Sequence, residues 1–294
     1  MMTLVQSLDT SLIRDVNRSH GMFSKVNHFA SVVRMAVLSH LKLIEYYADE
    51  YDIIFFVDDY TYPILKDIFP DTVKKFSDYM PLNETNIWTQ SKINCFKFVK
   101  APFLHIDSDI IFKKKICLKE AENSEIYVER IEDRYTFNWY TNGIRYMDEA
   151  YGIYRSKDWC DLNRAVEYWR PDLKFAYNCG LFGFNSEDAK NKYVEFYNEL
   201  ENLYSWRLLF EPYYEQIFVV LEQYALNCFA IKENLTVKYL LEGTSLDEQS
   251  KIADKVGYVH LFGVAKYLEV NIKKIAGILE SEYLHIYNKL ETLK

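Results

Sequence analysis

The stretch Phe103-Leu104-His105-Ile106-Asp107-Ser108-Asp109-Ile110-Ile111-Phe112 decides how the fold of this chain is interpreted. An apolar run of this length predicts a buried strand. Two ionised carboxylates inside a strand are unfavourable unless they are paired or bind a metal ion. We therefore expect Asp107 and Asp109 where the strand leaves the sheet, with a divalent cation between them. Oxygen ligands suit Mg²⁺ or Mn²⁺, ions that usually keep coordination positions for substrate phosphates. The stretch predicts an enzyme that handles a phosphorylated donor.

The sequence before this stretch alternates strand and helix patterns. Leu4 to Leu8 and Asp52 to Val57 are apolar runs typical of strands, and Val26 to Tyr47 carries apolar residues at helical spacing. Shorter helices are expected over residues 62–69 and 86–99. Strands that alternate with helices predict an α/β fold with a mostly parallel central sheet flanked by helices.

Asp58 and Asp59 follow the strand that ends at Val57. Ligands of such sheets bind outside the carboxyl ends of the strands, so these two acids are expected to share a crevice with Asp107 and Asp109. Asp58 is a candidate for binding a base or ribose. Helix N-capping is the alternative role, because Asp is a favoured capping residue.

The second half is less regular, and it has no Pro/Gly/Ser-rich linker. One continuous domain over residues 1–267 is expected, with a C-terminal amphipathic helical extension over 268–294 packed on it. The remaining expected elements are strands over 125–131, 175–185 and 258–262, helical segments over 142–169 and 191–229 with Pro212 breaking the second, and a loop or short exposed helix over 242–255.

Composition narrows the functional class. The net charge of −8 argues against nucleic acid as the main partner. Aromatic residues make up 17% of the chain; their rings suit sugars and nucleobases, whereas the alternative is that most of them fill the core. The cysteines lack metal-binding spacing, the N-terminus lacks a signal-peptide pattern and no apolar run reaches about 18 residues. These features predict a cytoplasmic protein without a transmembrane segment.

Four short elements follow one another along the chain: Asp107-Ser108-Asp109, Tyr177-Asn178-Cys179-Gly180, Glu222-Gln223-Tyr224-Ala225-Leu226-Asn227, and His260-Leu261-Phe262-Gly263-Val264-Ala265-Lys266. Their order resembles the GT-A glycosyltransferases, most closely the retaining enzymes of glycosyltransferase family 8 and related bacterial capsule and lipooligosaccharide transferases. Those enzymes carry a D-x-D strand, an N-A-G element, a D-Q-D-x-L-N element and a closing H-x-x-G-x-x-K. The last element matches at all three fixed positions.

The resemblance implies a GT-A fold and a metal-dependent transfer of a sugar from a nucleotide-sugar, usually a UDP-sugar, to an acceptor hydroxyl. Retention at the anomeric carbon is implied, as is a role in surface polysaccharide or glycan synthesis. The implied metal ligands are Asp107, Asp109 and His260, and the ion is Mn²⁺ or Mg²⁺. Gly263 and Lys266 would contact the donor phosphates. The acceptor would be a glycan or a lipid-linked molecule, which permits peripheral membrane contact.

The resemblance also assigns roles to residues of the other elements. Asn178 and Gly180 would bind the donor sugar, and Glu222 and Gln223 would be catalytic. A second pair, Glu215-Gln216, lies about two helical turns earlier and is an alternative to that pair. Further donor-binding candidates, which rest on position, are Gln6, Ser7, Asp9, Lys92 and Ser108.

Two other functions are consistent with these residues. A phosphatase of the haloacid-dehalogenase type also uses an apolar strand with D-x-D, but that motif lies on an early strand and is followed closely by Thr or Val, whereas Ile110 and Ile111 follow it here. A carbohydrate-binding protein on the same fold, without turnover, would suit the aromatic content. It would also suit Tyr224, which departs from the family's second aspartate.

Overall fold

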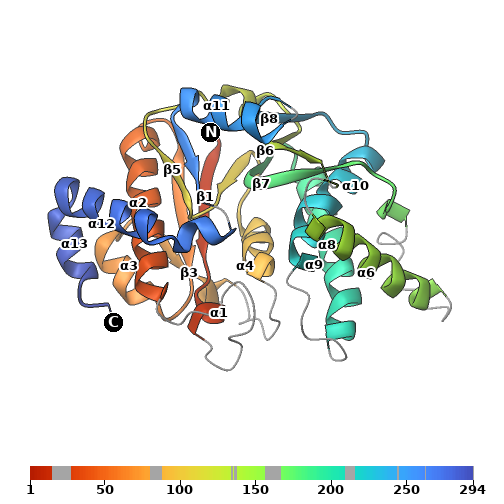
Figure 1. Cartoon of the computed structure of the whole chain (residues 1–294), viewed down its shortest axis with the longest axis horizontal. Helices are drawn as coiled ribbons and strands as arrows, with labels where there is room; N and C mark the ends of the chain where they lie inside the picture. The colour runs from red at the N-terminus through yellow and green to blue at the C-terminus, as the bar shows by residue number, and fades with distance from the viewer. Residues whose placement is uncertain are drawn as a thin grey trace. The chain divides into compact units, whose positions relative to one another are not determined.

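The chain adopts a mixed α/β fold with a seven-stranded, mostly parallel central sheet flanked by helices (Figure 1). The computed structural model describes residues 1–14, 28–79, 88–133, 135, 138–155, 167–208, 216–243, 245–261 and 263–293. The strand order is β3 (Val73–Lys75), β2 (Asp52–Val57), β1 (Thr3–Leu8), β4 (Phe103–Ile106), β7 (Phe175–Phe184), β6 (Ile126–Asp133) and β8 (Val237–Leu241). Strands β5 (Ile110–Phe112) and β9 (Tyr258–His260) form a separate two-stranded sheet.

The contacts divide the chain into two compact units. The first comprises Met1–Asn86, His105–Cys117 and Ala253–Lys294, and the second comprises Ile87–Leu104 and Leu118–Ile252. No helix of the described residues is long and apolar enough to cross a membrane.

In the first unit, β1, β2 and β3 run parallel to one another. Helix α2 (Phe29–Tyr47) lies between this layer and the C-terminal helices α12 (Glu269–Glu282) and α13 (Leu284–Leu290), which Figure 1 shows beside it in blue. Ile275 and Leu279 of α12 join the same core cluster as Val33 and Val37 of α2. Burial of this apolar face explains why the expected C-terminal extension forms a packed helix pair. The unit also contains the short helices α1 (Ser11–Arg14) and α3 (Tyr62–Ile68).

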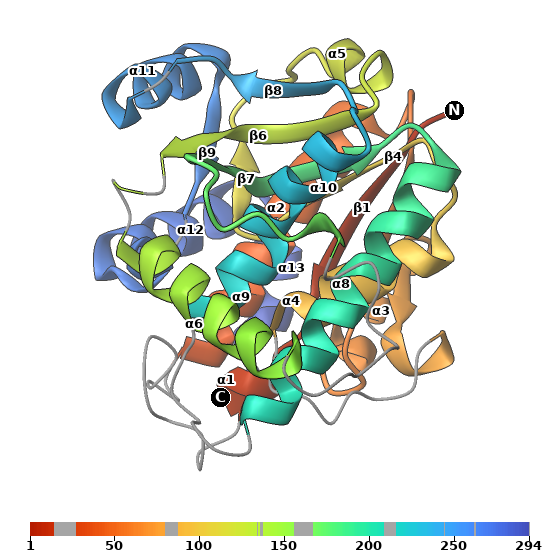
Figure 2. The ribbon, with the colours of Figure 1, turned by 90° about the vertical axis from the view of Figure 1, so that its right-hand side faces the viewer.

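In the second unit, β6 pairs antiparallel with β7 and parallel with β8. Its helices are α4 (Trp88–Cys95), α5 (Lys119–Glu122), α6 (Asn138–Arg155), α8 (Glu187–Leu208), α9 (Gln216–Val219), a π-helical turn η5 (Val220–Tyr224) and α10 (Ala225–Lys232). Figure 2 shows α6, α8 and α9 side by side.

Aromatic rings fill much of this second core. Phe184 packs against Tyr193 and Phe229, with ring centroids 5.5 and 6.3 Å apart. Phe96 lies 4.7 Å from Phe103 and 5.3 Å from Phe182. These pairs account for many of the rings by core packing, which is the alternative role that the composition left open.

Most of the predicted elements form, with one important correction. The apolar run over residues 103–112 is not one strand: β4 ends at Ile106, residues 107–109 turn, and β5 starts a different sheet at Ile110. The turn is closed by the Ile110 amide, which donates to the Asp107 carbonyl at 3.0 Å. Aspartate favours turns because its side chain competes for backbone groups. The chain therefore leaves the sheet at the two carboxylates.

Other boundaries differ more modestly. The edge strand β8 was not predicted, because Lys238 and Tyr239 are exposed and leave no alternating apolar pattern. Residues 242–255 mostly form a helix, α11 (Leu246–Val256). The helix expected over 86–99 is α4 followed by the 3₁₀ turn η4 (Phe96–Phe98). Parts of the helical segments expected over 142–169 and 191–229, including Pro212, lie outside the described residues.

Candidate functional site

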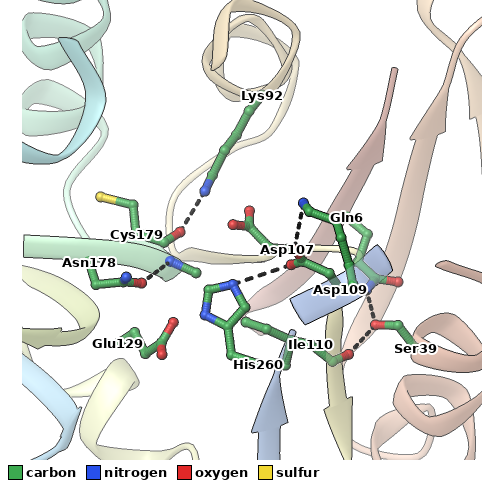
Figure 3. A network of polar contacts seen from close by, with 12 residues as sticks. Gln6, Ser39, Lys92, Asp107, Asp109, Ile110, Glu129, Asn178, Cys179 and His260 are labelled. Atoms are coloured by element: carbon green, nitrogen blue, oxygen red, sulfur yellow. Dashed lines mark hydrogen bonds and ion pairs between the residues drawn. The ribbon is translucent and has the colours of Figure 1, made fainter. Parts of the chain in front are cut away.

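Asp107, Asp109 and His260 come together at the turn between β4 and β5. Strand β5 pairs antiparallel with β9 so that Ile110 lies opposite His260. The Leu261 amide extends this ladder by donating to the Asp109 carbonyl at 3.0 Å. The three side chains each offer one ligand atom, and these atoms lie within 4.8 Å of one another. The β5–β9 pairing thus joins residues that are about 150 positions apart in sequence (Figure 3).

Asp109 is the buried centre of this cluster. Its Oδ2 accepts a hydrogen bond from Lys266 Nζ at 3.0 Å, and its Oδ1 lies 3.3 Å from His260 Nε2. Burial alone would raise the pKa of Asp109, but the charges of Lys266 and His260 hold it well below its usual range. Burial lowers the pKa of Lys266, but the neighbouring groups, Asp109 foremost, raise it above its usual value. Asp109 is therefore an anion at neutral pH.

The donor set fits a divalent cation. Among the described residues, the buried Oδ1 of Asp109 has the 3.3 Å ion-pair contact with His260 Nε2 but no hydrogen bond of good geometry, and a buried polar atom in this state is unfavourable. A metal ion held by this oxygen, an oxygen of Asp107 and a ring nitrogen of His260 would satisfy it. Two carboxylates and one imidazole are ordinary ligands of Mn²⁺ and related ions.

Lys266 and Gly263 belong to the short 3₁₀ turn η6 (Gly263–Tyr267) that follows β9. Gly263 has a φ of 57°, in the left-handed region that glycine adopts without a side-chain penalty. This turn brings Lys266 back to Asp109. Ser108 lies partly buried between the two aspartates. The spacing of the closing motif is therefore explained by the strand and the turn that carry it.

Ser7 and His105 adjoin Asp107. His105 is fully buried; its Nε2 lies 2.8 Å from Ser7 Oγ and its Nδ1 lies 3.5 Å from Asp107 Oδ1. His105 was not among the predicted site residues. The signal that could have identified it is a histidine two positions before the first aspartate, inside an otherwise apolar strand.

Three other predicted donor-binding residues, Gln6, Asp58 and Asp9, make hydrogen bonds within the first unit that give them a structural role. Gln6 is buried, where its Nε2 donates to Ser39 Oγ at 2.7 Å and its Oε1 lies 2.8 Å from His40 Nδ1. Asp58 accepts hydrogen bonds from Thr10, through both the amide and the hydroxyl at 2.6 Å, and from the amides of Tyr60 and Thr61 at 2.9 Å.

Asp9 accepts a hydrogen bond from the Ser11 amide at 2.9 Å, next to the short helix α1. For Asp58 and Asp9 these contacts match the turn role that aspartate commonly has. Asp58 is not the N-cap of α3, because Thr61 occupies that position.

Lys92 and Glu222 form a buried ion pair in the second unit. Their Nζ and Oε1 atoms are 2.7 Å apart, and the side chains are 5% and 1% exposed. Lys92 also donates to the Cys179 carbonyl at 2.5 Å. Glu222 lies on the π-helical turn, a feature that often occurs at functional sites. One ammonium group thus joins the Asn178-Cys179-Gly180 element to the Glu222-Gln223 element.

A second polar network links Asn178 and Gln223. Glu132 accepts from Asn178 Nδ2 at 2.8 Å on one oxygen and from the Tyr140 hydroxyl at 2.6 Å on the other. The Tyr140 hydroxyl also contacts the side-chain amide of Gln223. Asn178 Oδ1 in turn accepts from the Gly180 amide at 3.0 Å.

Arg130 provides a positive charge beside the carboxylate of Glu132 in this network. Its guanidinium donates to Glu132 Oε1 through Nη2 at 2.8 Å and contacts Glu129 Oε1 at 3.3 Å. All three charged side chains are buried on strand β6. Sequence reasoning missed them, although three charges in an apolar strand, within Ile126–Asp133, were a signal of a buried polar site.

Tyr224, the departure from the resembled motif, is fully buried. Its hydroxyl accepts from the Leu173 amide at 3.0 Å and donates to the Arg170 carbonyl at 2.6 Å. A tyrosine at this position therefore holds the segment before β7. In the alternative pair, Gln216 begins α9, and Glu215 lies outside the described residues.

The structure therefore gathers the predicted site residues into two clusters. The first unit groups Ser7, Asp107, Asp109, His260 and Lys266, and the second unit groups Lys92, Asn178, Gly180, Glu222 and Gln223.

Comparison with known proteins places the chain in a family. The sequence model described as "Family of unknown function (DUF6734)" matches residues 2–293, so the chain belongs to that family. None of the curated proteins matches it.

Among solved structures, the chain is similar to mouse xyloside xylosyltransferase 1, with 10% identity, a TM-score of 0.43 and coverage of 88% of this chain and 97% of that one. It is also similar to the bifunctional glycosyltransferase WbbM, with 14% identity, a TM-score of 0.48 and coverage of 98% and 51%. Both TM-scores lie below 0.5, so the function is argued from the residues of the site.

Proposed function

We propose that this member of the DUF6734 family is a metal-dependent glycosyltransferase of the GT-A type, which moves a sugar from a nucleotide-sugar to an acceptor hydroxyl. UDP is the proposed nucleotide, Mn²⁺ or Mg²⁺ the proposed ion, and retention at the anomeric carbon the proposed outcome. The acceptor is a glycan or a lipid-linked molecule.

One observation carries the proposal: Asp107, Asp109 and His260 place ligand atoms within 4.8 Å of one another, and Lys266 lies against Asp109. A cation site beside a lysine suits a diphosphate, because the phosphate oxygens complete the coordination and the ammonium adds a compact positive charge. The buried Asp109 Oδ1, which lacks a hydrogen bond of good geometry among the described residues, supports the metal half of the proposal.

The residues of the first unit have distinct tasks in this function. Asp107, Asp109 and His260 would hold the ion, which supplies Lewis-acid stabilisation of the charge that develops on the departing nucleoside diphosphate. Lys266 would contact the same phosphates. Gly263 would let the backbone approach them, since it carries no side chain. Such contacts strengthen as the leaving group gains charge, and they therefore favour the transition state.

In the second unit, Asn178 and Gln223 are the proposed contacts to the donor sugar. Both are amides whose side chains are fixed through the Glu132 carboxylate, directly or through Tyr140. Preorganised polar groups of this kind orient a substrate at little cost during the reaction. Glu222 is assigned a positioning role, because its carboxylate is buried against Lys92. Lys92, Gln6, Asp9 and Asp58 are likewise assigned to support of the fold around the site.

The experiment is an assay of UDP release by the full chain with a panel of UDP-sugars, with Mn²⁺ and with EDTA. We expect release with at least one donor, lost with EDTA and lost in Asp109→Asn, while circular dichroism shows the wild-type fold. Asp254→Asn is the matched control, because Asp254 is 78% exposed and pairs with Lys113 at the surface. The control variant should keep full activity.

Two outcomes would contradict parts of this function. If no nucleotide-sugar binds or turns over in a metal-dependent way, the function is wrong. If a UDP-sugar binds and Asp109→Asn keeps that binding while no donor is turned over, the protein is a carbohydrate-binding protein without transferase activity.

A further inference from the structure

His105 connects the metal-ligand candidate Asp107 to Ser7 of strand β1. The imidazole is fully buried, with Nε2 2.8 Å from Ser7 Oγ and Nδ1 3.5 Å from Asp107 Oδ1. Asp107 itself is 25% exposed. The ring thus lies between a strand of the core and a carboxylate at the edge of the cluster.

The contacts of the ring with Ser7 and Asp107 favour one tautomer. A neutral imidazole has one N–H donor and one acceptor nitrogen, and an ionised carboxylate only accepts. The arrangement compatible with both neighbours has the Ser7 hydroxyl donating to Nε2 and the Nδ1–H directed at Asp107. At 3.5 Å the contact with Asp107 is electrostatic rather than a full hydrogen bond. It still favours one orientation of the carboxylate.

We propose that Ser7 and His105 are positioning residues for the metal ligand Asp107. The inference rests on the proposed function, since it needs a cation at this cluster. Partners behind a metal ligand fix its orientation, and their loss typically weakens metal affinity 10- to 100-fold, a general order of magnitude. The role differs from direct binding of the donor, for which Ser7 is a candidate by its position in the sequence.

The experiment measures Mn²⁺ affinity directly, by electron paramagnetic resonance of the free ion titrated with the full chain, without nucleotide. The variants are Ser7→Ala, His105→Phe and the double variant. His40→Phe is the control, because His40 is also a buried imidazole with two side-chain partners, Gln6 and Thr72, both at 2.8 Å. Binding of uridine without metal reports on base and ribose contacts.

We expect His105→Phe to weaken Mn²⁺ binding about tenfold or more, within the range for such partners, and Ser7→Ala to weaken it by a smaller factor. Ser7→Ala should add nothing in the His105→Phe background, because it acts through that ring. His40→Phe should keep the wild-type affinity. If His105→Phe fails to fold, the Mn²⁺ affinity of Ser7→Ala tests the inference by itself, because this substitution removes a single oxygen atom.

Three results would overturn the inference. Wild-type affinity for Mn²⁺ in Ser7→Ala would do so, and so would additive losses in the double variant. Weaker uridine binding by Ser7→Ala with unchanged Mn²⁺ affinity would return Ser7 to the nucleotide. These outcomes leave the proposed function intact, whereas absence of Mn²⁺ binding by the wild-type chain would overturn the metal site and this inference together.

Discussion

Lys92 and Glu222 pair inside the second unit, with Nζ 2.7 Å from Oε1 and less than a tenth of either side chain exposed. From the sequence these residues were expected to have separate tasks, donor binding and catalysis. The ion pair gives Lys92 and Glu222 a common structural task. Lys92 binds Glu222 on the π-helical turn and the Cys179 carbonyl on β7, so both elements that carry the proposed sugar contacts are fastened to one ammonium.

Replacing Lys92 by Met should strongly destabilise the protein. The variant leaves the Glu222 carboxylate buried without its cation, which typically costs about 3–5 kcal/mol. Urea unfolding followed by circular dichroism measures the loss. The double variant Lys92→Met/Glu222→Gln should recover part of it, since the uncompensated charge is gone. Lys289→Met is the control, because its pair with Asp67 is 46% and 68% exposed and such pairs contribute about 0–1 kcal/mol. If Lys92→Met and Lys289→Met lowered the free energy of unfolding equally, the burial of the Lys92–Glu222 pair would not explain the effect.

His40 should make the stability of the protein depend on pH. Burial lowers the pKa of His40 from 6.5 to about 3, so the ring is neutral in the folded chain. The unfolded chain binds a proton below about pH 6.5, and stability is therefore lost as the pH falls below that value. From about pH 7 to about pH 5 the loss attributable to this residue is about 2 kcal/mol.

The measurement is a series of urea titrations of the wild type and His40→Gln across this pH range. The variant should show a flatter pH dependence by the stated amount. Its absolute stability is not the test, because the substitution also changes the contacts with Gln6 and Thr72. Parallel pH profiles for the two proteins would exclude a neutral buried His40.

Local pattern predicted the elements whose signal is continuous in sequence. The strands β1 and β2 are short, largely apolar runs with most of their residues buried or partly buried, and the helix α2 carries apolar residues at helical spacing that match its buried face. The exit from the sheet at the two carboxylates was expected, but the separate strand β5 was not, since the apolar run continues after Asp109 although the hydrogen-bonding partner changes from the central sheet to β9. That change depends on a strand about 150 residues away.

In the candidate site, too, contacts between residues distant in sequence could not be predicted from local pattern. The group of Asp107, Asp109 and His260 was predicted through a resemblance of motifs, and the β5–β9 pairing supplies its physical cause. His105 and Glu132 were missed because their importance lies in contacts with Asp107 and Asn178, which no local spacing encodes. Asp58 combines both kinds of contact: its turn contacts with the Tyr60 and Thr61 amides are local, whereas Thr10 comes from a distant part of the sequence.

The C-terminal helix pair should contribute strongly to the stability of the first unit. Leu279 of α12 is fully buried in the cluster that contains Val33 and Ile275. Leu279→Ala should therefore cost about 2–5 kcal/mol in the free energy of unfolding. The control is Leu284→Ala in α13, where the side chain is 56% exposed and the expected change is within about 0.5 kcal/mol. A small effect of Leu279→Ala in urea unfolding would show that the pair is dispensable for the core.

Tyr140 should affect turnover more than nucleotide binding. Its hydroxyl connects Glu132 to the Gln223 amide, and its single proton can serve only one of them. The amide oxygen of Gln223, Oε1, is the atom that accepts from the phenol, so this contact fixes the direction of the Gln223 amide. Tyr140→Phe removes this constraint, and misplacement of a substrate contact by about 1 Å can reduce the rate about 100-fold.

We expect Tyr140→Phe to lower the kcat of UDP release about 10- to 100-fold, with little change in the affinity for UDP in the presence of Mn²⁺. Tyr47→Phe is the matched control, because Tyr47 is a buried phenol of the first unit whose hydroxyl bonds to the backbone oxygen and amide of Ile116. Both variants should lose similar stability, so a selective loss of kcat in Tyr140→Phe reflects the orientation of Gln223. An equal fall in UDP affinity would instead assign Tyr140 to nucleotide binding, and an unchanged kcat would remove Gln223 from the reaction.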